Sequence, residues 1–207
     1  GDAGRAMARG LTLAHGHGLV YNPGEPVEGY TAWLWVMLAW VAALLKVDPL
    51  SFTQWINVAS QMGTVWLAFH LGDRAERNPL RALVAPALVA THLANVTWSM
   101  MGLETNFLMV LATGAVLLQA RTVEPSARSS LALGALLLLV ALVRFDGLIL
   151  AGVVMAYALL VDRQWKRSLP AIGVLAAGLG AFNLWRLAYY GQPFPNTKPA
   201  LFADFGE

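Results

Sequence analysis

A few charged residues interrupt the long apolar stretches of this sequence, and they are the first candidates for chemistry. Glu104 follows Gly102-Leu103 in a short turn, and Arg144 and Asp146 flank Phe145 in another. Charged groups at membrane depth are costly and often mark functional sites or pair with one another. Because Glu104 has no basic neighbour in the sequence, we expect Arg144 to be its partner. The alternative for Arg144 and Asp146 is a local ion pair that stabilises a tight hairpin.

Two segments rich in Gly, Pro and Asn carry further polar side chains. Residues 16–31 read GHGLVYNPGEPVEGYT, and residues 189–198 read YYGQPFPNTK. These residue types favour turns, so we expect both segments to be loops. For His17, a metal or general-base role competes with a hydrogen bond to backbone, and metal ligation is disfavoured because His15 does not supply ligand spacing. The candidate binding residues in the two loops are His17, Asn22, Glu28, Tyr30, Tyr190, Asn196 and Lys198.

The composition indicates an integral membrane protein. The 207 residues are 57% hydrophobic and 13% charged, with a mean hydropathy of +0.57, whereas soluble proteins carry roughly 25% charged residues. The net charge of +2 comes without a basic patch that contains aromatic residues, so nucleic acid is not expected as a partner. With no cysteine, the chain cannot form disulfides or thiolate metal sites.

Charge-free runs and basic loops together predict a topology. Short cytoplasmic loops carry an excess of Lys and Arg, and the loops 73–81, 121–128 and 163–167 hold most of the basic residues. The run 29–45 contains Trp33, Trp35 and Trp40, so we expect it to lie along the outer interface, with an ordinary span as the alternative. The crossings expected are 53–72, 80–97, 104–120, 129–143, 147–162 and 168–187.

We therefore predict an all-α fold, a polytopic membrane bundle of about six transmembrane helices with interfacial helices on the outer face. Residues 1–52 would form an outer-face loop with interfacial helices, residues 53–187 the bundle, and residues 188–207 the start of a large outer-face loop. Several spans are short for a hydrocarbon core about 30 Å thick. Their outer ends should therefore form a recessed bowl, which Asp2, Glu28, Arg144 and Asp146 would share.

Five ordered stretches resemble the GT-C superfamily of membrane glycosyltransferases, and in particular its branch of bacterial cell-wall arabinofuranosyltransferases. They are Asp2-Ala3, the run 16–31, Gly102-Leu103-Glu104-Thr105, Arg144-Phe145-Asp146-Gly147, and the run 189–197. The resemblance implies the N-terminal part of a GT-C fold, so we expect the chain to be part of a longer one. It also implies a bacterial plasma-membrane location, with the active site on the non-cytoplasmic face.

The activity that the resemblance implies is sugar transfer from a polyprenyl-phosphate donor to a glycan, lipid or protein acceptor of the cell envelope, which we expect to be inverting. Asp2 would be the catalytic base. Arg144, with Arg186 or Lys198, would hold the donor phosphate. The other candidates (Glu28, Tyr30, Glu104, Asp146 and Asn196) would bind sugar hydroxyls or orient Arg144. No motif requires a cofactor, although the grouped carboxylates could hold a divalent cation.

Two positions depart from the family pattern. Gly1 precedes Asp2 where the family has a pair of aspartates, and Phe145 stands where the family has proline. The first departure makes a non-catalytic membrane protein one alternative function. A transporter or flippase is another, although such proteins place charges within interrupted helices near the midplane, whereas the charges here flank the apolar runs.

Overall fold

The computed structural model describes residues 2–16, 18–19, 28, 32–75, 78–121 and 126–192. These residues form ten α-helices and no strand, which confirms the all-α class. The helices are α1 (Asp2–Ala14), α2 (Trp33–Leu44), α3 (Pro49–Ala75), α4 (Pro79–Ala82), α5 (Val84–Thr91), α6 (Leu93–Met101), α7 (Thr105–Arg121), α8 (Ala127–Val143), α9 (Gly147–Leu160) and α10 (Trp165–Tyr190).

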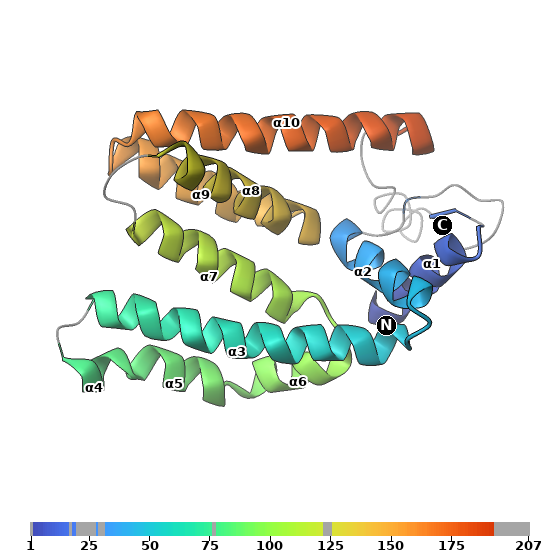
Figure 1. Cartoon of the computed structure of the whole chain (residues 1–207), viewed down its shortest axis with the longest axis horizontal. Helices are drawn as coiled ribbons and strands as arrows, with labels where there is room; N and C mark the ends of the chain where they lie inside the picture. Colours follow the sequence, from blue (N-terminus) through green and yellow to red (C-terminus); the bar gives the residue numbers. More distant parts are fainter. Residues whose placement is uncertain are drawn as a thin grey trace, which may run out of the picture.

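The longer helices are stacked in order, so that neighbours in the sequence are neighbours in space. Figure 1 shows α3 along one side and α10 along the other, with α7, α8 and α9 between them. The short helices α4 to α6 run back along α3, and α1 and α2 lie together at one end of the stack. Each pass along the bundle therefore ends in a turn at one of two opposite ends.

The two ends of the bundle differ in their charges. The last turns of α3, α7 and α9 lie at one end, together with the start of α10 (Figure 1). Exposed basic residues, including Arg74, Arg121 and Lys166, occupy these helix ends. The turns 102–104 and 144–146 lie at the opposite end with α1 and α2. This is the division into two groups of turns that the basic loops predicted.

The helix lengths support only one or two of the six expected crossings. By length and composition, α10 could cross a membrane, and the bent pair of α4–α5 and α6 could form a second span. The shorter apolar helices α7, α8 and α9 have 17, 17 and 14 residues, or about 21–26 Å. Helix α2, with 12 residues, measures only about 18 Å, and the expectation that 29–45 does not cross stays a prediction.

The expected span 80–97 is broken, a feature that the sequence analysis did not predict. His92 has an extended backbone (ψ 109°) between α5 and α6, and the two parts are bent by 45°. At the break, the Val89 carbonyl accepts a hydrogen bond of 2.9 Å from Gln61 Nε2 of α3. A buried carbonyl needs such a donor, so a polar side chain on the neighbouring helix stabilises the bend.

Close contact between α8 and α10 depends on glycine. A Cβ atom at Gly134 would lie 2.6 Å from the Ala171 carbonyl oxygen and 2.8 Å from Val174 Cβ. Ala171 is itself fully buried, together with Leu133 and Leu137 of α8. The two backbones can therefore approach each other only while position 134 has no side chain.

We predict that Gly134→Ala destabilises the protein by about 1–3 kcal/mol, because the added methyl group overpacks the α8–α10 contact. Gly173→Ala is the matched control, since nothing lies within 4 Å of a Cβ at that helical position. The control should be neutral or stabilising by about 0.5–1 kcal/mol. Thermal unfolding followed by circular dichroism measures both, and equal midpoints for the two variants would contradict the packing argument.

Candidate functional site

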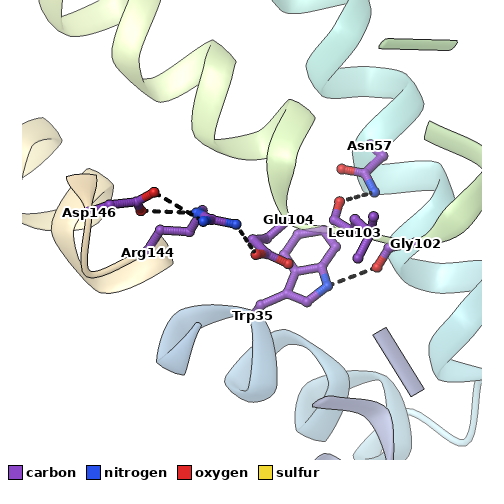
Figure 2. Close-up of polar contacts among 7 residues, drawn as sticks. All are labelled: Trp35, Asn57, Gly102, Leu103, Glu104, Arg144 and Asp146. Carbon is purple, nitrogen blue, oxygen red and sulfur yellow. Dashed lines mark hydrogen bonds and ion pairs between the residues drawn. The ribbon is translucent and has the colours of Figure 1, made fainter. Parts of the chain in front are cut away.

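The turn at 102–104 is fixed by donors from two other helices. Gly102 ends α6 in the left-handed conformation (φ 68°), which favours glycine. Its carbonyl accepts a hydrogen bond of 3.0 Å from Trp35 Nε1, and the Leu103 carbonyl accepts one of 2.6 Å from Asn57 Nδ2 (Figure 2). Helices α2 and α3 therefore hold the backbone that carries Glu104.

Glu104, Arg144 and Asp146 form a continuous chain of ion pairs. Arg144 Nη1 donates to Glu104 Oε1 at 3.1 Å, while Nε and Nη2 donate to the two Asp146 oxygens at 2.9 and 3.0 Å (Figure 2). The expected contact between Glu104 and Arg144 is confirmed, and the local pair with Asp146 is present as well. The two turns are thus joined across 40 residues of sequence.

Charge and exposure make Arg144 suited to binding an anion. Its hydrogen bonds to Asp146, above all, raise the pKa of the guanidinium, and the same bonds lower the pKa of the Asp146 carboxyl. The Arg144 side chain is 38% exposed. Three of the five N–H donors of a guanidinium are used in the contacts described. The remaining donors could reach a phosphate or carboxylate ligand.

Glu28 and Arg186 form a second ion pair, which is buried. Arg186 Nε lies 2.9 Å from Glu28 Oε2, Nη2 donates to Oε1 at 2.9 Å, and the side chains are only 6% and 3% exposed. Burial raises the pKa of the Glu28 carboxyl, and the charge of Arg186 opposes that effect. Arg186 also lies 4.8 Å from the centre of the Phe182 ring. With this partner and burial, Arg186 is a poor candidate for holding a donor phosphate.

An aromatic cluster surrounds the end of α10. Trp185 stacks on Tyr189 with ring centres 5.5 Å apart, and Trp33 of α2 packs edge-on against Phe182 at 5.3 Å. The Trp33 indole Nε1 is buried and has no hydrogen-bond partner in the described part of the chain. Sequence reasoning assigned these rings no role beyond the interface preference of tryptophan, because their clustering depends on how α2 and α10 pack.

Tyr189 and Tyr190 belong to the last turn of α10, so the loop expected from residue 189 begins later. The Tyr190 hydroxyl donates to the Leu19 carbonyl at 2.9 Å, and the Tyr189 hydroxyl accepts from the Leu19 N–H at 2.9 Å. Both tyrosines therefore position the amino-terminal segment. Gly191, in the left-handed conformation (φ 71°), ends the helix instead.

The structure describes only part of the predicted site. Asp2 begins α1, but its side chain lies outside the described part. Among the described residues, no group of three His, Cys, Asp or Glu side chains could hold a metal ion. The bowl shared by Asp2, Glu28, Arg144 and Asp146 stays a prediction. The other predicted residues outside the described ranges are His17, Asn22, Tyr30, Asn196 and Lys198.

Comparison with known proteins finds a distant relative. The chain is 26% identical, over 205 residues, to the terminal β-(1→2)-arabinofuranosyltransferase of Mycobacterium tuberculosis. The match covers 91% of this chain and 32% of the relative, so the chain spans about a third of that protein's length. No family model matches the chain, and no solved structure does so significantly. The chain is thus distantly similar to a sugar transferase.

We predict that Asn57→Leu destabilises the protein by about 1–3 kcal/mol, because the Leu103 carbonyl would lose its donor. Leucine has the same branching and the same number of side-chain heavy atoms as asparagine, so the change leaves no cavity. Gln192→Leu, an exposed position just after α10, is the control and should change stability by less than about 0.5 kcal/mol. The midpoint of thermal unfolding tests both, and an unchanged midpoint for Asn57→Leu would show that the turn does not depend on this bond.

Proposed function

We propose that the chain is part of a membrane glycosyltransferase that moves a sugar from a polyprenyl-phosphate donor to a glycan, lipid or protein acceptor of the bacterial cell envelope. The observation that carries the proposal is the Glu104–Arg144–Asp146 chain, a partly exposed guanidinium held between two carboxylates at one end of the bundle. Two of the stretches that resemble the GT-C superfamily supply these residues. The distant match to an arabinofuranosyltransferase supports the same class of reaction.

The membrane placement is part of the proposal. The exposed basic helix ends would face the cytoplasm, in keeping with the preference of Lys and Arg for that side. Residues 53–187 would then form six crossings, with α4 to α6 as one bent span and residues 1–52 and 188–207 on the outer face. The apolar length of α10 and the 45° bend between α5 and α6 support this placement. The Glu104–Arg144 site would lie on the non-cytoplasmic side.

In the proposed inverting transfer, an acceptor hydroxyl attacks the anomeric carbon while the bond from that carbon to the phosphate oxygen breaks. Asp2, near the outer end of the bundle, takes the acceptor proton. Arg144 binds the departing phosphate through charge-assisted hydrogen bonds. Glu104 and Asp146 fix the guanidinium plane, since each holds one of its edges. Tyr30 and Asn196 would contact sugar hydroxyls, and Lys198 would help Arg144 to hold the phosphate. His17 and Asn22 would be further substrate contacts.

A transporter or a non-catalytic protein is the alternative. The described ion pairs of Arg144 lie in turns at the end of the bundle and not within helices at its middle, which favours surface chemistry over translocation. A purified full-length protein that moves no sugar from any polyprenyl-phosphate donor, yet carries such lipids between leaflets, would favour the alternative.

We predict that Asp2→Asn in the full-length protein lowers the rate of sugar transfer by about 100- to 10,000-fold, because it removes a general base. Folding and donor binding should persist, since the change adds almost no volume. Asp48→Asn is the matched control at the same end of the bundle, where Asp48 Oδ2 accepts from the Ser51 N–H and asparagine can still cap α3. Undiminished transfer by Asp2→Asn would reject this base and point to Asp146, since Glu28 is buried in its ion pair with Arg186.

We predict that Arg144→Gln weakens donor binding by about 10- to 150-fold, the loss expected for hydrogen bonds to a charged group. The measurement is the KM for a polyprenyl-phosphate sugar, compared with that of Arg128→Gln, an exposed arginine at the opposite end. The control should leave KM unchanged. If both variants bind the donor as the parent does, Arg144 does not hold the phosphate.

A further inference from the structure

A cavity lies at the end of the bundle opposite the Glu104–Arg144 site. It has a volume of about 700 Å³ and is bounded by α7, α9 and the turn between α9 and α10. Its walls are mostly apolar, with Val116 on α7 and Leu150 and Val153 on α9. Volumes of this size are typical of small-molecule sites, and no residue proposed for sugar transfer lines it.

The cavity has polar groups at the end near the α9–α10 turn. Gln119 is only 6% exposed, and its Nε2 donates to Asp162 Oδ2 at 2.9 Å. Its Oε1 is buried and has no hydrogen-bond partner within the described ranges. A buried acceptor without a donor destabilises the folded protein. A ligand that brings a donor into the cavity would recover this loss.

Arg167 does not fill this role, because its two Nη groups donate to the backbone of α7 and to the Gln164 side chain. The residue is fully buried; Nη2 donates to the Leu118 carbonyl at 2.9 Å and Nη1 to the Gln119 carbonyl at 3.3 Å. It thereby satisfies carbonyls that the last turn of α7 leaves open. The Gln119 amide oxygen and the exposed Asp162 carboxylate remain as acceptors beside the cavity.

These groups define the chemistry of a ligand. A carboxylate and an amide oxygen together favour a cation that carries N–H donors. The apolar walls favour a hydrocarbon chain. Three exposed basic residues near this polar end (Arg121, Arg163 and Lys166) would attract a phosphate. A phospholipid whose head group carries a primary ammonium contains all three parts: an ammonium, a phosphate and hydrocarbon chains.

We propose that this cavity binds a membrane phospholipid with a primary ammonium head group, of the phosphatidylethanolamine type. The ammonium donates to Gln119 Oε1 and Asp162, the phosphate faces the basic helix ends, and one acyl chain lies along α7 and α9. The proposal rests on the membrane placement proposed above, in which this end faces the cytoplasm, and it is independent of the sugar chemistry.

Native mass spectrometry of the delipidated full-length protein tests the proposal. The protein is titrated with phosphatidylethanolamine, phosphatidylcholine and phosphatidylglycerol; the choline head group has no N–H donor and the glycerol head group has no cation. We expect phosphatidylethanolamine to bind about tenfold more tightly than the other two. Asp162→Asn should remove most of this preference, because it removes one charge-assisted interaction. Asp73→Asn, an exposed aspartate at the same end, is the matched control and should keep it.

Three results would overturn the inference. One is equal binding of the three lipids, and another is an unchanged preference in Asp162→Asn. The third is lipid binding that survives Val153→Trp, which places a large ring in the cavity. Membrane fractionation of the same protein distinguishes a failure of the lipid-site proposal from a failure of the proposed membrane placement. A protein that enters the membrane fraction but shows no head-group preference contradicts only the lipid site, and one found outside that fraction contradicts the placement itself.

Discussion

The arrangement of the end of the bundle that carries Glu104 and Arg144 depends on supplying donors to the Gly102 and Leu103 carbonyls, between α6 and α7. Carbonyls of buried, irregular backbone need hydrogen-bond donors. Trp35 and Asn57 donate to the Gly102 and Leu103 carbonyls, and Arg144 binds the Glu104 side chain. Helices α2 and α3 and the turn after α8 therefore converge on three consecutive residues.

The same constraint explains the polar side chains along α3. Besides Asn57, Gln54 Nε2 donates to the Met100 carbonyl at 2.6 Å, and Gln61 Nε2 donates to the Val89 carbonyl. Their acceptors belong to α5, α6 and the following turn, so these amides lie on the side of α3 that faces those elements. The Val89 carbonyl lies just before the break at His92, and the Met100 carbonyl lies in the last turn of α6. Each amide therefore supplies a donor that a continuing helix would otherwise provide. Polarity within an apolar helix thus stabilises irregular backbone beside it.

The described ion pairs are of two kinds, which differ in their exposure to solvent. Glu28 and Arg186 are almost fully buried and hold the amino-terminal segment against α10, together with the tyrosines that bind Leu19. Arg144 is partly exposed and is held by carboxylates on two sides. A buried pair of this kind fixes structure, because breaking it would leave a charge unpaired. An exposed guanidinium with spare donors can bind a ligand instead.

The sequence by itself determined the helical class, the grouping of the turns at two ends, and the contact of Glu104 with Arg144. These follow from the lengths of the apolar runs and from the rule that charges in apolar surroundings find partners. The tertiary structure alone decided that His92 breaks a helix, that Tyr190 is helical, and that Glu28 pairs with Arg186 across 158 residues. Each of these depends on which donors and acceptors packing brings together, and neither hydrophobic periodicity nor residue spacing encodes contacts at that range.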